Sequence, residues 1–290
     1  MLTVVDKRLG IFYNKDMEKT TREKRILVTG ACGGMGGATV RMLIQKGFRV
    51  FAVDKVISNP VADVSYYTAD CTSWEELTNV FEEVKKQTEY LDGIVHFSGI
   101  YNLDSLLEIE EKEFVRLFDI NLFGCYRVNK LFSPLLKKGS RVIITSSELA
   151  PLSPLPFTGL YAVSKCALES YAESLRMELN LLGVSLSILR PGAVRTGLLN
   201  VSTSALDRFT KQTKLYRCNA ARFKRIVDSV EAKNVPPEKV AKLSYKALTS
   251  RKPRYVYNLN RNPLLRLLNV LPRRMQVWII GRILRDKNGN

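Results

Sequence analysis

The stretch RILVTGACGGMG, residues 25–36, decides the fold of this chain. A short apolar run ends in a cluster of glycines, and a helical pattern follows from 36 to 46. This order predicts a strand, a tight turn and a helix. Glycine lets the backbone turn sharply, and the N-terminus of the helix presents free N–H groups to an anion. The stretch therefore favours a binding site for the pyrophosphate of a dinucleotide.

Outward from this turn, strand and helix signals alternate over two-thirds of the chain. Apolar runs predict strands at 48–53, 94–97, 141–145 and 184–189, and another strand ends just before Asp70. Helical patterns begin at Ser73, which forms a capping box with Glu76, and recur at 110–136 and 159–182. Strands separated by helices of this length predict an α/β fold, a doubly wound, Rossmann-like parallel sheet covered on both faces.

The length of 290 residues suits one large domain with extensions at both ends. We expect an N-terminal extension at 1–24, which is too charged for a signal peptide, and a catalytic domain at 25–250. A basic, amphipathic helical extension follows at 251–290. The five cysteines form no CxxC pair, so neither a disulfide framework nor a metal site is expected. A reducing, cytoplasmic location fits best.

The net charge of +17 is concentrated in the last third. Residues 1–200 hold 24 Lys and Arg against 23 Asp and Glu, whereas residues 201–290 hold 21 against 5. Such a surface could bind nucleic acid, as basic surfaces do. The chain carries no recognised nucleic-acid motif, however, and no nucleic-acid partner is expected.

Asp54 closes the second strand, 18 residues after Gly36. A carboxylate there can accept both ribose hydroxyls of NAD and would repel a 2′-phosphate, so NAD(H) is expected rather than NADP(H). A solvated acid at a strand end is the alternative, and Lys55 could meet a phosphate. Asp70 is expected near the adenine, or is a simple turn residue.

Tyr161 and Lys165 lie four residues apart on one face of a predicted helix. A tyrosine can exchange protons near neutral pH only if its pKa falls by about 3 units, which needs roughly 4 kcal/mol of anion stabilisation. A nearby ammonium and a nicotinamide cation can supply it. Ser147 ends the preceding strand, 14 residues ahead of Tyr161, and could hold a substrate oxygen. The alternative is an exposed Tyr and Lys with no such role.

Over residues 24–200 these motifs resemble the short-chain dehydrogenase/reductase family, and its hydroxysteroid and retinol dehydrogenase-like members in particular. The family's TGxxxGxG turn is matched by Thr29, Gly30, Gly34 and Gly36. Its tetrad maps onto Asn121, Ser147, Tyr161 and Lys165. The resemblance implies that Tyr161 exchanges the proton and Ser147 orients the carbonyl. It also implies that Lys165 binds the nicotinamide ribose and lowers the tyrosine pKa, and that Asn121 holds a water. From the sequence alone, Asn121 could equally face solvent or pack in its helix.

The resemblance also implies a set of residues around the cofactor. Pro191 and Gly192 match the turn that closes over the cofactor, and Thr196 matches the hydroxyl beside the nicotinamide amide. The full set that we expect to bind it is Gly30, Cys32, Gly34, Met35, Gly36, Asp54, Asp70, Cys71, Ser98, Gly99, Tyr161, Lys165, Pro191, Gly192, Val194 and Thr196.

The chain departs from the family pattern in two places. His96-Phe97-Ser98-Gly99 replaces the usual Asn-Asn-Ala-Gly, which puts local sheet-bracing contacts in question. His96, the only histidine, is interpreted as a core residue. The spacing from Ser147 to Tyr161 is also slightly long for the family.

Two segments should shape the substrate pocket. Residues 149–157 are apolar and stiffened by prolines, and residues 197–230 should form a mobile lid. An apolar wall suggests a lipophilic substrate such as a steroid, a retinoid or a long-chain alcohol. The lid also carries several lysines and arginines, which either form a solvated face or meet an anionic substrate or headgroup.

The C-terminal tail predicts two further helices. Asn262 and Pro263 open the first, and residues 274–285 form the second, with Met275, Val277, Ile279, Ile280, Ile283 and Leu284 on one side and arginines on the other. Residues 251–287 hold ten Lys and Arg against one acid. The tail could dock on its own domain, contact an anionic membrane peripherally, or bind a protein.

Together these patterns predict an NAD(H)-dependent oxidoreductase that interconverts a secondary alcohol and a ketone. The family implies a homodimer or homotetramer. Three alternatives are a non-catalytic NAD-binding regulator, a membrane- or nucleic-acid-associated protein, and a nucleotide-sugar epimerase or dehydratase. The intact tetrad argues against a passive binder, and the short C-terminal segment argues against the sugar enzymes.

Overall fold

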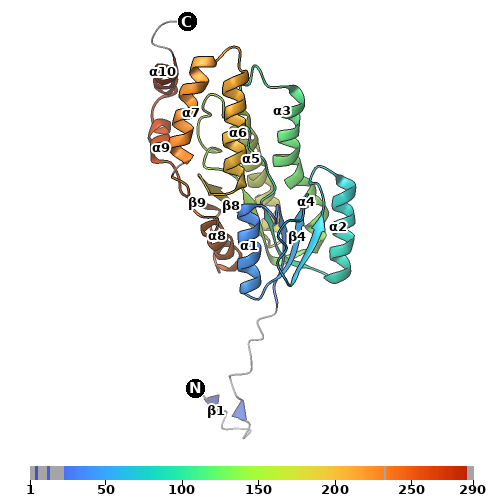
Figure 1. Ribbon diagram of the computed structural model, residues 1–290. Helices are drawn as coiled ribbons and strands as arrows, with labels where there is room; N and C mark the ends of the chain where they lie inside the picture. The colour runs from blue at the N-terminus through green and yellow to red at the C-terminus, as the bar shows by residue number, and fades with distance from the viewer. Residues whose placement is uncertain (1–3, 6–11, 14–22, 232, 286–290) are drawn as a thin grey trace.

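Seven parallel strands form the central sheet of the computed structural model, which describes residues 4–5, 12–13, 23–231 and 233–285 (Figure 1). The sheet order is β5-β4-β3-β6-β7-β8-β9. The strands are β3 (Arg25–Thr29), β4 (Arg49–Asp54), β5 (Val64–Thr68), β6 (Leu91–His96), β7 (Leu136–Thr145), β8 (Ser185–Pro191) and β9 (Val256–Leu259). Of the predicted N-terminal extension, only the paired strands β1 (Val4–Val5) and β2 (Phe12–Tyr13) and the residues next to β3 are described.

Helices cover both faces of the sheet because successive strand residues point to opposite sides. In β3, Ile26 and Val28 pack in a core with α1 (Gly34–Gln45) and α8 (Glu238–Thr249). Leu27 lies in the opposite core with α2 (Trp74–Gln87) and α4 (Gly124–Phe132). On that second side, α5 (Gly159–Leu181) covers β7 and β8. The predicted doubly wound parallel sheet is confirmed.

The strand order reverses between β3 and β6, which lie side by side although α1, β4, β5 and α2 separate them in the chain. In such sheets ligands bind in the crevice outside the carboxyl ends of the strands at the reversal. Gly30 follows β3, and Ser98 and Gly99 follow β6. The fold thus brings the glycine turn and the altered His96–Gly99 segment to one crevice.

One stretch after β6 departs from regular helix. The chain runs from α3 (Glu111–Phe118) through a π-helical turn, η1 (Asp119–Phe123), into α4, and a short 3₁₀ turn, η2 (Ser133–Leu135), leads into β7. A π-turn widens the helix by one residue and is frequent at functional sites. Asn121 lies in this turn, where the sequence predicted ordinary helix.

The sheet extends beyond residue 250, where the sequence predicted the catalytic domain to end. In β9, Val256 pairs with Ile188 of β8, so the last strand lies beyond residue 250. Neither α8 nor β9 was predicted. The four residues of β9 are too few for a periodicity signal, and only the neighbouring strand defines them as sheet.

Four helices form a layer over the carboxyl end of the sheet (Figure 1): α6 (Gly197–Gln212), α7 (Arg217–Glu231), α9 (Pro263–Val270) and α10 (Arg273–Leu284). Of these, α6, α7 and α10 share a core that contains Leu103, Phe157, Leu206, Phe209, Phe223 and Leu284. As predicted, Asn262 caps α9, and its Oδ1 accepts from the Leu264 N–H at 2.9 Å. The predicted lid and tail are therefore packed on each other.

The apolar side predicted for the second tail helix is partly used by the protein itself. Ile280 and Leu284 pack into the core under α7, and Asn219 Nδ2 donates to the Leu284 carbonyl at 2.8 Å. Part of the tail therefore docks on its own domain, which is one of the three possibilities that the sequence left open. Val277 and Trp278 remain 70% and 68% exposed. Among the residues that the structure describes, every helix is either too short or too polar to span a lipid bilayer.

Candidate active site

The glycine turn after β3 is closely packed at each glycine of the predicted motif. Gly30 has a φ of +64°, which favours glycine, and a Cβ there would lie 2.5 Å from the Ser98 nitrogen. A Cβ on Gly36 would lie 2.0 Å from the Gly30 oxygen, and one on Gly34 would lie 2.6 Å from the Thr196 Cβ. The backbone can approach this closely only without side chains. The turn therefore forms a cradle at the N-terminus of α1, where free N–H groups favour an anion.

A groove of about 1080 Å³ extends from this turn across the ends of β4 and β5. At its edge, Asp54 Oδ2 accepts a hydrogen bond from the Cys32 N–H at 2.8 Å, which fixes the carboxylate beside the glycine turn. Seven of the predicted cofactor residues line this groove: Gly30, Cys32, Asp54, Asp70, Cys71, Ser98 and Gly99. The groove has the position and polarity that an adenosine ribose requires.

Lys55 does not stand free beside Asp54. Its ammonium lies 2.6 Å from Asp70 Oδ2. Burial alone would raise the pKa of Asp70, but hydrogen bonds from Lys55 and Thr72 hold it below its usual value. Glu76 completes the turn, because its carboxylate accepts from the Asp70 N–H at 2.8 Å. Only half of the predicted capping box forms: Ser73 Oγ accepts from the Glu76 N–H, while Glu76 reaches Asp70 instead.

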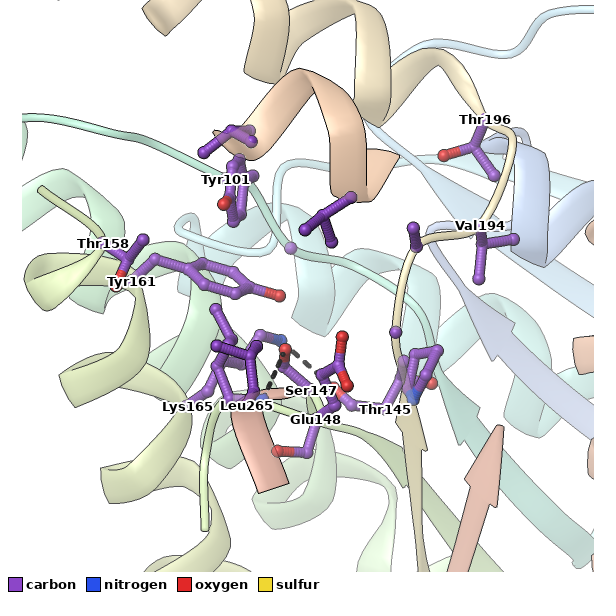
Figure 2. Close-up of a pocket in the computed structure, with 18 of the residues that line it drawn as sticks. Tyr101, Thr145, Ser147, Glu148, Thr158, Tyr161, Lys165, Val194, Thr196 and Leu265 are labelled. Atoms are coloured by element: carbon purple, nitrogen blue, oxygen red, sulfur yellow. Dashed lines mark hydrogen bonds between the residues drawn. The ribbon is translucent and has the colours of Figure 1, made fainter. Parts of the chain in front are cut away.

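A second cavity, of about 190 Å³, adjoins the groove (Figure 2). Phe97, Gly99 and Ile100 line both spaces, so the two are continuous along the carboxyl ends of the strands. The remaining predicted residues that line it are Met35, Ser147, Tyr161, Lys165, Pro191, Gly192, Val194 and Thr196. Three predicted residues line neither the groove nor the cavity: Gly34, Gly36 and Asn121.

Tyr161, in the first turn of α5, points its hydroxyl into this cavity (Figure 2). Burial raises its pKa to about 12, and a hydrogen bond with Ser147 offsets part of that rise. The ring of Tyr101 packs against it edge to face at 4.4 Å. Ser147 Oγ also accepts from the Leu149 N–H at 3.2 Å. Both hydroxyl-bearing residues line the same cavity despite the 14-residue spacing.

Lys165 lies one helical turn after Tyr161 and is buried. Its Nζ donates to the Thr145 carbonyl at 3.1 Å and stands 5.9 Å from the centre of the Tyr161 ring. Desolvation lowers its pKa to about 8. A buried ammonium with one protein acceptor keeps two donors for other partners, such as ribose hydroxyls.

Asn121 is buried and fully hydrogen-bonded. Its Nδ2 donates to the Ile100 carbonyl at 3.0 Å and to Ser164 Oγ at 3.2 Å, and its Oδ1 accepts from the Ile100 N–H at 2.8 Å. The side chain thus joins the segment after β6 to α5. Asn121 Oδ1 and Lys165 Nζ both flank Gly99, at 3.2 and 3.5 Å from the position of an added Cβ. The sequence left open whether Asn121 faces solvent or packs inside the protein, and its burial excludes the first alternative.

The outer walls of the cavity are apolar and come from the two segments that the sequence predicted to shape it, although only residues 149–157 were predicted to be apolar. Leu149 and Leu155 come from the proline-rich loop, and Phe223, Ile226, Val227 and Val230 come from α7. Sequence reasoning missed Leu265 of the tail and the acid Glu148, which also line the cavity. No periodic pattern identifies either one, because each depends on how the tail folds back.

Glu108 ties the turn between α6 and α7 to the body of the protein. Its carboxylate accepts from Thr213 Oγ1 at 2.6 Å, from the Lys214 N–H at 2.7 Å and from the Leu215 N–H at 3.2 Å. One lid cation, Lys224, is paired with Asp207 and Asp228. The lid therefore has a defined docked position.

His96 is a core residue, as predicted. It is 4% exposed, its Nε2 lies 3.0 Å from Asn129 Oδ1, and burial lowers its pKa to about 4. Within the described part of the chain, no three His, Cys, Asp or Glu side chains come together in a way that could hold a metal ion.

Comparison with known proteins agrees with this geometry. The family model for "short chain dehydrogenase" matches residues 24–207. The chain is 25% identical over 230 residues to a 3-ketodihydrosphingosine reductase of Bacteroides thetaiotaomicron, covering 79% of this chain and 84% of that one. It is 28% identical over 223 residues to human 17-beta-hydroxysteroid dehydrogenase type 6, covering 71% and 69%.

Among solved structures, a short-chain dehydrogenase from Streptomyces avermitilis superimposes with a TM-score of 0.71 at 22% identity, covering 90% of this chain and 97% of that one. This likeness concerns the fold. The family match, by contrast, spans the glycine turn and the Ser147, Tyr161 and Lys165 cluster. The chain therefore belongs to the short-chain dehydrogenase family of oxidoreductases.

Proposed function

We propose that the protein is an NAD(H)-dependent oxidoreductase that interconverts a secondary alcohol and a ketone on a lipophilic substrate. The observation that carries the proposal is that Ser147, Tyr161 and Lys165 line one largely apolar cavity, which adjoins the glycine-turn groove. A hydroxyl pair in an apolar cavity suits a carbonyl oxygen.

The residues present fit a nicotinamide dinucleotide. The glycine cradle, which a Cβ would fill, would hold the pyrophosphate, and Asp54 the adenosine ribose. Lys165 would hold the nicotinamide ribose, and Val194 and Thr196 the amide. When bound, the cofactor supplies or accepts the hydride.

The protein's own part of the reaction is to place and move one proton. Ser147 donates a hydrogen bond to the substrate oxygen, and Tyr161 exchanges a proton with that same oxygen. With a pKa of about 12, the tyrosine releases its proton near neutral pH only if positive charge lies close to it. The Lys165 ammonium, one helical turn away and 5.9 Å from the centre of the Tyr161 ring, contributes that charge.

The preference for NAD(H) rests on Asp54. Its carboxylate would repel a 2′-phosphate, and the nearest cation, Lys55, is already paired with Asp70. The lipophilic substrate is supported by the walls contributed by the loop and α7, and by the names of the two relatives, which act on a sphingoid ketone and on steroids.

A substrate panel tests the proposed reaction. Purified protein would be offered steroid, retinoid and long-chain ketones with NADH, and the matching alcohols with NAD, and NADH absorbance followed. We expect turnover with at least one lipophilic pair. Tight NADH binding without turnover of any member would instead support a non-catalytic, NAD-binding regulator.

We further propose that the tail holds the cavity mouth at an anionic membrane surface. At 100° per residue, the side of α10 opposite the buried Ile280 carries Trp278 with three exposed arginines: Arg274, Arg282 and Arg285. On α9, Leu264, Leu267 and Val270 form an exposed stripe, while Leu265 of the same helix lines the cavity. Exposed tryptophan and apolar side chains among arginines are typical of a peripheral membrane contact.

Truncation at residue 250 would remove β9, so the membrane test needs the full chain. Wild type and a Val277→Ser/Trp278→Ser variant would be sedimented with anionic and with neutral liposomes. We expect salt-sensitive binding to anionic liposomes only, reduced several-fold in the variant. Wild-type protein that stays in solution with anionic liposomes at low salt would contradict the proposal.

Exposed apolar side chains of η1, α4 and α5 support association of two or four copies. Phe123, Tyr126 and Val163, from η1, α4 and α5, are 47%, 45% and 42% exposed. We propose that these helices meet their counterparts in a homodimer or homotetramer. Light scattering coupled to size-exclusion chromatography tests this, with Tyr126→Glu expected to shift the protein toward monomer.

A further inference from the structure

Glu148 is the only acid among the described residues that line the catalytic cavity. It directly follows Ser147, and only 6% of it is exposed. Figure 2 shows its carboxylate in the same space as the Tyr161 hydroxyl. Neither the hydride transfer nor the proton exchange proposed above uses this group, so its presence in a largely apolar cavity needs its own explanation.

The carboxylate is held by neighbours on two sides. Oε2 accepts a hydrogen bond from the Asn262 N–H at 2.6 Å, at the start of α9. Oε1 lies beside the closing turn, 2.8 Å from where a Cβ on Gly192 would stand. The Glu148 N–H donates to the Pro191 carbonyl at 2.9 Å, which fixes the backbone as well. No hydrogen bond from a described residue reaches Oε1.

Holding a carboxylate in this position is unfavourable. Burial raises the pKa of Glu148, and the Asn262 N–H and the nearby charge of Arg261 only partly offset it. The Asn262 N–H needs no more than a neutral acceptor, which a glutamine would supply without this cost. A charged acceptor with one oxygen unbonded is suited to a donor that arrives with a ligand.

We propose that Glu148 binds a hydrogen-bond-donating substituent, an ammonium or a hydroxyl, on the carbon next to the reacting carbonyl. This inference rests on the proposed function. Ser147 and Tyr161 hold the carbonyl oxygen, and Glu148 follows Ser147 in the chain with its side chain in the same cavity. The substrate class is then a lipophilic ketone with an adjacent amine or hydroxyl group.

The competing explanation is that Glu148 only fastens the start of α9. Glu148→Gln separates the two roles, because the amide oxygen still accepts from the Asn262 N–H but carries no charge. Glu148→Ala removes both the acceptor and the charge. Glu75→Gln, on the exposed side of α2, is a matched control for loss of a carboxylate elsewhere.

The experiment compares three ketones of equal chain length: unsubstituted, 2-hydroxy and 2-amino. For wild type and Glu75→Gln, we expect kcat/KM to favour a substituted ketone about tenfold or more, as a charge-assisted hydrogen bond would give. In Glu148→Gln the preference for the amine should fall to near unity, whereas a preference for the hydroxyl should fall only in part. The ketone that wild type prefers identifies the substituent that Glu148 binds.

The outcomes are distinguishable. If wild type reduces the unsubstituted ketone and treats all three alike, the role of Glu148 is wrong and the proposed reaction stands. If Glu148→Gln lowers all three to the same extent, Glu148 acts through the fold and the inference is also wrong. If wild type reduces neither these three ketones nor any other ketone of the substrate panel, the proposed reaction is wrong. This inference is then wrong as well.

Discussion

Replacing Lys165 by methionine should stabilise the protein while inactivating it. Desolvation lowers the pKa of Lys165 from 10.5 to about 8. One pKa unit corresponds to about 1.4 kcal/mol, so keeping the ammonium charged costs the folded state about 3 kcal/mol at neutral pH. Methionine has a similar shape and no charge. It loses the hydrogen bond to the Thr145 carbonyl, worth about 1 kcal/mol, which leaves a net gain of about 2 kcal/mol.

Thermal unfolding followed across pH measures this gain. For a chain of this length, about 2 kcal/mol corresponds to a rise in Tm of about 3 °C. Between the folded and unfolded pKa values the unfolded chain binds more protons, so wild-type stability rises as pH increases through 8 toward 10.5. The advantage of Lys165→Met should therefore shrink over that window.

Two results would refute the reasoning about Lys165. One is a variant that melts below wild type at neutral pH, and the other is an advantage that stays constant to about pH 10. Lys242→Met, at an exposed position of α8, is the control and should leave Tm nearly unchanged. Activity measured alongside should fall strongly in Lys165→Met only, because the variant cannot supply the positive charge near Tyr161.

Two further substitutions test the cofactor groove and the lid. Asp54→Ala should narrow or reverse the preference for NADH over NADPH, because a 2′-phosphate no longer meets a carboxylate. Measuring kcat/KM with both cofactors checks this, and a wild type that prefers NADPH would contradict it. Glu108→Ala removes three hydrogen bonds to the turn between α6 and α7 and should raise KM for a lipophilic substrate several-fold. Glu110→Ala, at an exposed position, is the control. An unchanged KM in Glu108→Ala would show that the hydrogen bonds to Glu108 do not position the lid.

The parts of the site that could be predicted from sequence are those fixed by short-range geometry. The glycine turn follows from one strand, one turn and one helix in succession. Tyr161 and Lys165 share a helical face because they are four residues apart. The strand that ends just before Ser147 and the helix that begins at 159 were each marked by local patterns. The fold class followed from the alternation of these elements.

The parts that could not be predicted depend on contacts between distant segments. Glu148 and Leu265 meet in one cavity only because β9 returns the tail to the sheet next to β8. Lys55 pairs with Asp70 because β4 and β5 end side by side. The apolar positions of α10 were predicted to share one side of the helix, but only packing under α7 decided that Ile280 and Leu284 of that side turn inward.

The proton-transfer role of Tyr161 is the central claim, and turnover by the Tyr161→Phe protein tests it most directly. Rates would be measured beside wild type on a ketone that wild type reduces, with NADH affinity and Tm measured on the same preparations. We predict turnover lower by about two to four orders of magnitude, with NADH affinity and Tm close to wild type, because only one hydroxyl is removed. Near-normal turnover by a folded, NADH-binding Tyr161→Phe protein would contradict the account.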